Sequence, residues 1–240
     1  MEEIIRNTAL FDGLTNSEIK AVVRSSQAAK RADRAFFFLE GDPAERVFVL
    51  GDGKVKLSQV TETGQQVILG YIAPGKVYGI VALLEDVEYP VSAQAVGTCE
   101  AYFWTQKDLH RLMTDFPRIT FNAMQIMGEQ IRQFQGIVTD LATRRVEQRI
   151  ARAILRLARQ SGRKTEVGIL IDLPLSRQDL AEMTGTTLYT VSRVLALWEK
   201  QGLTQSKRKQ IIITNSHGLV TIAEDLPSGQ QPAVWVDEEM

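Results

Sequence analysis

The chain has 240 residues, 44% of them hydrophobic and 24% charged, which is typical of a globular protein of one or two domains. The longest apolar runs are too short to cross a bilayer, and the N-terminus, MEEIIRNTALF, lacks the charged-then-apolar pattern of a signal peptide. We therefore expect a cytoplasmic protein without membrane contact. The single cysteine, Cys99, excludes an internal disulfide and a cysteine-ligated iron–sulfur cluster, which needs about four thiolates.

The net charge of −1 conceals an uneven distribution. Residues 144–209 include 14 basic and 6 acidic residues, a net of +8, whereas the rest of the chain has 14 basic and 23 acidic residues, a net of −9. This asymmetry predicts that only the C-terminal part meets a polyanion such as nucleic acid.

The N-terminal part predicts helices followed by strands. Residues 1–30 look helical, with Thr15 as an N-cap and Glu18 at the capping-box spacing. From Ala35 to Trp104, apolar bursts such as FFFL, VFVL and QVILGYI are separated by the turn signals GD, GDG, ETG and PG. Short strands at this spacing predict a β jelly roll, and a short helix over 107–116 completes a first domain at residues 1–116.

A long helix is predicted from Pro117 to about Arg145. Its apolar side chains recur at alternating steps of three and four, the spacing of a coiled-coil seam: Met124, Met127, Ile131, Phe134, Val138 and Leu141. A narrow stripe favours a dimer seam, although a helix packed on its own domain's core also carries an apolar stripe. We assign residues 117–145 to a dimerisation helix whose polar end, residues 140–145, is the expected hinge.

The C-terminal part predicts an Arg-rich helix over 146–160, a loop at SGRK and a strand at VGILIDLP. KRKQIIIT predicts a basic turn that leads into a strand. We assign residues 146–227 to a second domain and residues 228–240, which are polar and contain Pro and Gly, to a flexible tail.

The stretch LSRQDLAEMTGTTLYTVSRVLALWEKQGL, residues 175–203, predicts a helix-turn-helix. Two helices that cross steeply need a small residue where they cross, and Ala181 fits this position. The turn between them needs a residue that tolerates a left-handed conformation, which Gly185 does. The second helix needs an apolar residue that faces the first, and Val191 supplies it. Ser176, and Thr186 or Thr187, are candidate N-caps. A core helical hairpin shares this pattern, but the basic domain and the following basic turn, placed like a wing, favour DNA binding.

The second helix would present four residues to base edges in the major groove: Leu188, Tyr189, Ser192 and Arg193. Arg193 can donate two hydrogen bonds to a guanine, or alternatively contact a phosphate. We expect phosphate contacts, which add affinity without sequence information, from Arg177, Thr187, Thr190, Lys207, Arg208 and Lys209.

The order of roll, long helix and winged helix-turn-helix resembles the CRP/FNR family of bacterial transcription regulators, most specifically in GDPAERVFVLGDGKVKL and in residues 175–203. The resemblance implies an α+β fold with a cyclic-nucleotide-binding-like roll, a homodimer on a palindromic TTG-type operator, and contact with RNA polymerase. We expect an activator, although the sequence leaves activation and repression both open. It also implies that Ser192 and Arg193 read bases, with Arg193 on a guanine. Tyr189 stands where the family usually has Glu, so the base read there is open.

The resemblance also bears on the effector. In YGIVALLEDVEYPVSAQA, Ile80 and Tyr89-Pro90 replace the Glu and Arg-Ser that hold a cyclic phosphate, and Phe134-Gln135 replaces a nucleotide-contacting Thr-Ser, so we expect no cAMP. SRQDLAEMTGTTLYTVSR most resembles the Nnr/DNR-type regulators, which implies a response to nitric oxide through haem. His110, in the helix after the roll, is only a weak candidate for a haem ligand, because a histidine there is more often a solvated surface residue, and His217 lies past the wing. An N-terminal amine or a Tyr could also ligate the iron.

Two other functions compete with that of an effector-gated regulator. A cupin-like enzyme needs clustered His and carboxylate ligands, yet no His lies between Ala35 and Trp104, and the sequence shows neither a nucleophile–His pairing nor a P-loop, so we expect no enzyme. A DNA-binding dimer that responds to another small molecule, or to none, stays open.

Overall fold

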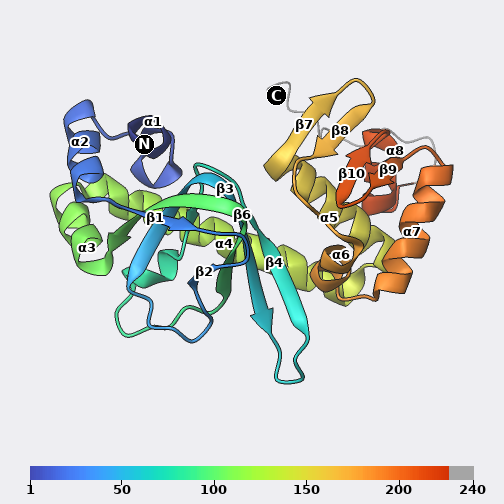
Figure 1. Ribbon diagram of the computed structural model, residues 1–240, viewed down its shortest axis with the longest axis horizontal. Helices are drawn as coiled ribbons and strands as arrows, with labels where there is room; N and C mark the ends of the chain where they lie inside the picture. The colour runs from blue at the N-terminus through green and yellow to red at the C-terminus, as the bar shows by residue number, and fades with distance from the viewer. Residues whose placement is uncertain (227–240) are drawn as a thin grey trace. The chain divides into compact units, whose positions relative to one another are not determined.

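The computed structural model describes residues 1–226, so the predicted flexible tail at 228–240 lies outside the described part. Contacts divide the chain within its longest helix. Unit 1 comprises Met1–Gly136, and unit 2 begins at Ile137 (Figure 1). Among residues 1–226, no helix is long and apolar enough to cross a membrane.

A six-stranded antiparallel sheet forms the roll of unit 1 (Figure 1). Its strands are β1 (Gln27–Arg31), β2 (Phe36–Phe38), β3 (Arg46–Val60), β4 (Gln66–Ile72), β5 (Val77–Tyr78) and β6 (Ser92–Thr105). The main order is β1-β6-β3-β4, with β2 paired to β6 and β5 paired to β3. Register shifts between Leu50 and Lys54 interrupt the long β3–β6 pairing, and such bulges bend strands so that a sheet can close on its core.

The helices of unit 1 are α1 (Glu2–Arg6), η1 (Ala9–Phe11), α2 (Asn16–Ser25), η2 (Ile80–Leu83), α3 (Gln106–Asp115) and the first part of α4 (Pro117–Thr143). The predicted capping box is confirmed, because the Thr15 N–H donates to a Glu18 carboxylate oxygen at 2.6 Å while the Thr15 hydroxyl caps α2. Trp104 is fully buried, and its indole N–H donates to the Val22 carbonyl at 2.9 Å. This bond ties α2 to β6.

One part of the predicted N-terminal helical region is wrong. Residues 27–31, QAAKR, form strand β1 and pair with β6 from Gln27–Phe103 to Arg31–Cys99. Ala, Lys and Gln are weak strand formers, so local propensity could not reveal this strand. The edge of β6 supplies the backbone partners, and this tertiary pairing decides the conformation.

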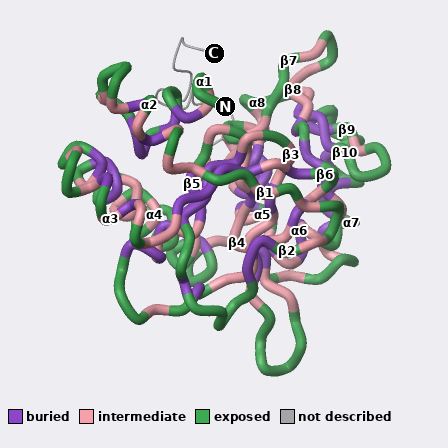
Figure 2. The backbone as a smooth tube through the Cα atoms, turned by 60° about the vertical axis from the view of Figure 1, so that its left-hand side comes forward, coloured by how far each residue is buried: buried purple, intermediate pink, exposed green. Residues whose placement is uncertain are grey.

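Unit 2 holds α5 (Val146–Ser161), β7 (Gly162–Thr165), β8 (Gly168–Ile171), α6 (Arg177–Thr184), α7 (Leu188–Lys200), β9 (Thr204–Lys207), β10 (Gln210–Ile213) and α8 (Ser216–Glu224). Its four strands pair antiparallel in the order β7-β8-β10-β9. Helix α5 packs against α6 and α8, and α6 packs against α7. Each of these helices has buried residues, and Figure 2 colours buried residues purple. The predicted succession of roll, long helix and winged helix-turn-helix is therefore present.

The loop predicted at SGRK is wrong, since Gly162–Thr165 is strand β7. Its partner is β8, in a register from Gly162–Ile171 to Thr165–Gly168. Gly168 has φ +145°, and a Cβ on it would lie 2.1 Å from the Ile213 carbonyl oxygen on β10. Only glycine permits this close approach of β8 to β10, and once β8 is placed it supplies the hydrogen bonds that order β7.

Candidate nucleic-acid interface

The turn between α6 and α7 is defined by hydrogen bonds and by one glycine. At the start of α6, the Ser176 hydroxyl accepts from the Asp179 N–H at 3.0 Å, and the Asp179 carboxylate accepts from the Ser176 N–H at 2.8 Å. At its end, Gly185 adopts the left-handed conformation with φ +60°. A Cβ at Gly185 would also lie 3.2 Å from Cδ2 of Leu141. The turn therefore favours glycine for its backbone conformation, and Leu141 would have to shift slightly to admit a larger residue.

Helix α7 is capped by Thr187, whose hydroxyl accepts from the Thr190 N–H at 3.2 Å and lies 2.9 Å from the Thr190 hydroxyl. Both threonines, which the sequence predicts as phosphate contacts, thus lie at the N-terminus of α7, where unpaired N–H groups favour anions. The predicted N-caps Ser176 and Thr187 are confirmed.

The two faces of α7 have opposite roles. One face is buried in the core of unit 2 through Val191, Val194, Leu195 and Trp198. The other carries the four predicted base readers, which we call the recognition face: Leu188, Tyr189, Ser192 and Arg193. Tyr189 is 77% exposed and Leu188 is 47% exposed, while Arg193 is exposed and Ser192 is half-buried. Tyr189 and Arg193 are thus open to a partner, as direct readout of base edges requires.

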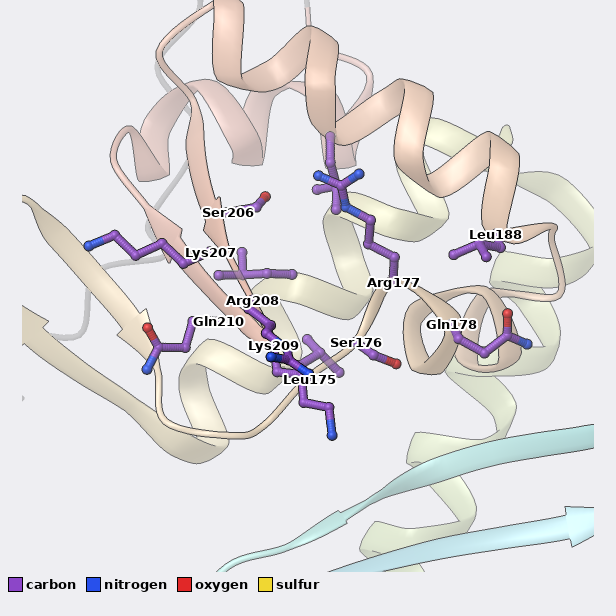
Figure 3. A pocket seen from close by; sticks show the side chains of 12 residues that line it. Leu175, Ser176, Arg177, Gln178, Leu188, Ser206, Lys207, Arg208, Lys209 and Gln210 are labelled. Carbon is purple, nitrogen blue, oxygen red and sulfur yellow. The ribbon is translucent and has the colours of Figure 1, made fainter.

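A groove of about 470 Å³ lies between the starts of α6 and α7 and the β9–β10 hairpin, which is the wing (Figure 3). It brings together residues far apart in the sequence: Arg177, Leu188, Lys207, Arg208 and Lys209. We call it the basic groove. Four of the six predicted phosphate contacts line it, while Thr187 and Thr190 lie outside it. Its cations are all exposed, so the groove presents a positive surface to a polyanion.

Three polar residues of the basic groove are not predicted from the sequence, namely Gln178, Ser206 and Gln210. Gln178 lies in the first turn of α6, where its side-chain amide donates to Glu182 at 2.8 Å, and Gln210 begins β10 after the wing turn. The sequence position of Gln178 could have predicted its place in the groove, because it follows Arg177 at the start of a helix. Gln210 has no such signal, since only the hairpin brings it to the groove.

In unit 1, packed side chains occupy the positions where a cyclic phosphate would need charged donors. Ile80 and Tyr89 are each 4% exposed. The Tyr89 ring stacks on Phe38 with 3.7 Å between centroids, and its hydroxyl donates to the Arg46 carbonyl at 2.7 Å and accepts from the Arg46 N–H at 3.1 Å. Neither Ile80 nor Tyr89 offers a cation to a phosphate, and both take part in the core.

His110, the predicted haem-ligand candidate, and two other side chains of unit 1 that could in principle ligate iron, Cys99 and Tyr78, are engaged or disfavoured. His110 has Nε2 3.0 Å from the Leu83 carbonyl oxygen, and the buried Cys99 thiol donates to the Lys54 carbonyl at 3.0 Å. Tyr78 is 1% exposed, and burial raises the pKa of its phenol, which disfavours the phenolate. Within the described chain, no group of three or more His, Cys, Asp or Glu could hold a metal ion. Helix α8 carries His217, in unit 2.

Five of the six predicted seam residues on α4 are exposed in the single chain: Met124 (67%), Ile131 (57%), Phe134 (47%), Val138 (65%) and Leu141 (47%). The sixth, Met127, is half-buried and packs against the core of unit 1. Leu141 also lies against the turn at Gly185. The apolar stripe is therefore largely uncovered within one chain.

Comparisons with known proteins agree with this architecture. Residues 148–222 match the Crp-like helix-turn-helix domain, and residues 32–116 match the cyclic nucleotide-binding domain. The global nitrogen regulator of Synechococcus elongatus is 31% identical over 180 residues, which cover 74% of this chain and 81% of that protein. The chain belongs to the CRP/FNR family of transcription regulators.

Other relatives cover more of the chain at lower identity. The CRP-like cAMP-activated global transcriptional regulator of Mycobacterium tuberculosis is 23% identical over 91% of this chain and 98% of that protein. The solved structure of FixK2 from Bradyrhizobium japonicum superposes with a TM-score of 0.73 at 22% identity, over 82% of this chain and 96% of that one, and supports the fold.

Membership in the CRP/FNR family confirms the predicted α+β fold. It makes the chain a DNA-binding transcription regulator with an effector-binding domain, and it confirms the prediction that the chain is not an enzyme. DNA is bound through the helix-turn-helix.

Proposed function

We propose that this regulator is a homodimeric activator that binds a palindromic operator with TTG-type half-sites. The observation that carries the proposal is the exposed recognition face, which includes Arg193 and whose Leu188 also lines the basic groove. Arg193 donates to a guanine, Ser192 and Tyr189 contact neighbouring bases, and the basic groove with Thr187 and Thr190 binds phosphates. The apolar stripe of α4 supports the homodimer, because a large exposed apolar stripe marks an interface.

The experiment is selection of binding sites from random DNA by the purified full chain, followed by footprinting. A two-fold dimer selects inverted half-sites whose centres are about 10–10.5 base pairs apart. A preference for direct repeats, or for single half-sites, would contradict the dimer. The same selection shows which base is preferred at the position that Tyr189 contacts. We expect this base to differ from the one that Glu reads in the family, because a phenol cannot accept from cytosine as a carboxylate does.

We propose nitric oxide, acting through haem, as the effector, and place the chain with the Nnr/DNR-type regulators. The support is the helix-turn-helix sequence; the roll in this conformation fits haem poorly, because His110 and Cys99 are engaged and the Tyr78 pKa is raised. An absorption spectrum of protein from haem-replete cells tests the proposal. A Soret band that shifts with nitric oxide supports it, and no Soret band favours another effector or none.

We further propose that cyclic nucleotides are not the effector and that the bound dimer contacts RNA polymerase in the cytoplasm. The packing of Ile80 and Tyr89 supports the first point, since a cyclic phosphate needs a charged donor there. Calorimetry with cAMP tests it directly, and binding at micromolar concentration would contradict it.

A further inference from the structure

The basic groove has an apolar lining as well as cations. Leu175, Leu195 and Ile211 all line it, and each is at most 2% exposed. The exposed cations of α6 and of the wing lie around this lining (Figure 3). The volume of about 470 Å³ is in the range of pockets that hold a small ligand, about 300–1,000 Å³. The groove therefore combines a hydrophobic pocket with a positively charged rim.

Phosphate binding accounts for the cations of the groove but not for its apolar lining. Contacts to DNA phosphates come from cations, hydroxyls and backbone N–H groups. Leu188, which is 47% exposed, adds further apolar surface where α7 borders the groove. An occupant that uses the whole groove needs an apolar side chain, such as the aromatic anchors that fill pockets at interfaces, next to negative charges.

The cations of the groove have no carboxylate partner among residues 1–226. None of the ion pairs in this part of the chain includes Arg177, Lys207, Arg208 or Lys209. Because like charges that share one groove repel each other, a negatively charged occupant would be stabilising there.

The chain itself contains a segment with both features. Residues 227–240, which follow the described part, have the sequence PSGQQPAVWVDEEM. Trp235 stands between two valines, and the acidic residues Asp237, Glu238 and Glu239 follow directly. The segment contains no Lys or Arg. It therefore places an aromatic side chain next to three negative charges.

The segment is long enough to reach the groove. Helix α8 ends at Glu224 and belongs to unit 2, as do α6, α7 and the wing. Trp235 follows Leu226, the last described residue, by nine positions, which an extended chain spans in about 30 Å. A compact unit of about 100 residues has a radius of gyration of about 13 Å, so this reach is comparable with the width of unit 2.

We propose that residues 233–239, AVWVDEE, dock in the basic groove when DNA is absent. Trp235 packs on the apolar lining, and the three carboxylates pair with the cations of α6 and the wing. DNA phosphates compete for the same cations, so the docked segment weakens binding to every DNA sequence until DNA displaces it. This docking rests on the proposed function only in that the groove is the proposed phosphate-binding surface.

Acrylamide quenching of tryptophan fluorescence in the full chain without DNA tests the docking. Trp104 and Trp198 are at most 1% exposed, so quenching above the background of a Trp235→Phe variant reports on Trp235. We expect its quenching constant to be about threefold to tenfold below that of a free peptide, QPAVWVDEEM, as docking in about 70–90% of molecules would give. A constant equal to that of the free peptide would overturn the proposal.

Charge reversal in the wing shows where the segment docks. Lys207→Glu/Arg208→Glu should raise quenching of Trp235 nearly to the level of the free peptide, because attraction becomes repulsion. Lys20→Glu/Arg24→Glu, which reverses two exposed cations on α2 in unit 1, is the control and should leave quenching unchanged. Thermal melts of both variants should match the wild type, since all four residues are exposed. No effect of the wing reversal, or equal effects of both, would overturn the assignment to the groove.

Binding to random duplex DNA measures the competition. Glu238→Gln/Glu239→Gln should tighten this binding by about threefold at low salt, the factor by which docking in about 70% of molecules hides the groove. Glu85→Gln/Glu88→Gln is the control, because it removes two exposed carboxylates from unit 1. Equal tightening by both variants would reveal an effect of net charge alone and overturn the competition. The quenching experiments contain no operator, so they remain decisive even if the proposed operator specificity fails.

Discussion

Two tyrosines show how differently the roll and the helix-turn-helix use the same side chain. Tyr89 in the roll is 4% exposed, stacks on Phe38 and exchanges two hydrogen bonds with the Arg46 backbone. Tyr189 on α7 is 77% exposed on the recognition face. The first tyrosine contributes to the stability of its domain, whereas the second is available to a partner. The roll therefore uses its tyrosine for packing inside the domain, whereas the helix-turn-helix exposes its tyrosine on the surface.

The difference follows from the geometry of the elements. The roll has a curved sheet whose inner face can hold either a ligand or its own aromatic side chains, and here Phe37, Phe38, Phe48, Tyr78 and Tyr89 pack against one another. A recognition helix has one buried stripe, and its remaining face has no such competition. Substitutions on the exposed face of α7 can therefore change the DNA specificity without disturbing the core. Substitutions inside the roll, in contrast, alter both ligand binding and packing.

The largest effect is expected at the predicted dimer seam of α4, the helix that begins in the unit of the roll and ends in the unit of the helix-turn-helix. Ile131→Asp would place a charge between two helices of a dimer, and burial of an unpaired charge is costly. We expect a monomer by light scattering and a loss of operator affinity of about 100-fold or more, because both half-sites must be bound together. Gln125→Asp, exposed on the same helix outside the seam, is the control. A dimer that persists in Ile131→Asp would move the interface elsewhere.

The next largest effect is expected on the outward face of α7. Arg193→Ala removes a bidentate contact to guanine and should cost about 1–3 kcal/mol at the operator. Binding to random DNA should change little, and the melting temperature should stay close to that of the wild type, because Arg193 is exposed. Competition assays with operator and random DNA measure the two terms. Equal losses on both would identify Arg193 as a phosphate contact.

The two tyrosines offer a direct test of the inward and outward roles. Tyr89→Phe loses the hydroxyl that bonds to Arg46, and should lower the unfolding free energy by about 1 kcal/mol while operator affinity stays unchanged. Tyr189→Phe should leave the melt unchanged and lower operator affinity a few-fold, with relaxed preference at one base pair per half-site. Thermal melts and binding isotherms on both variants measure this. If both variants changed stability alone, Tyr189 would not read DNA.

The smallest effect is expected in the basic groove. Lys207→Ala removes one exposed cation, so binding should weaken a few-fold on all sequences alike. The slope of the logarithm of affinity against the logarithm of salt concentration should fall in magnitude by about 1. Titrations at several salt concentrations measure the slope. A slope equal to that of the wild type would place Lys207 outside the DNA contact.

Much of the DNA-binding unit could be predicted from the sequence because its signals are local. Ser176 and Thr187 cap the helices as predicted, Gly185 adopts the left-handed conformation that the turn requires, and Val191 is buried. The residues of the recognition face follow from helical periodicity once the buried face is known. The order of roll, long helix and wing was likewise contained in the spacing of apolar and turn residues.

Tertiary structure decided what depends on partners distant in sequence. Strands β1 and β7, formed by QAAKR and GRKT, exist because β6 and β8 pair with them, and their own residues are weak strand formers. The pairing of Asp140 with Arg152 and Glu224 joins three helices and carries no sequence pattern. The roll interior is the clearest case. The sequence showed that charged phosphate ligands were missing there, but only packing showed that Tyr89 stacks on Phe38 in their place, because the inner face of a curved sheet is filled by residues from several strands at once.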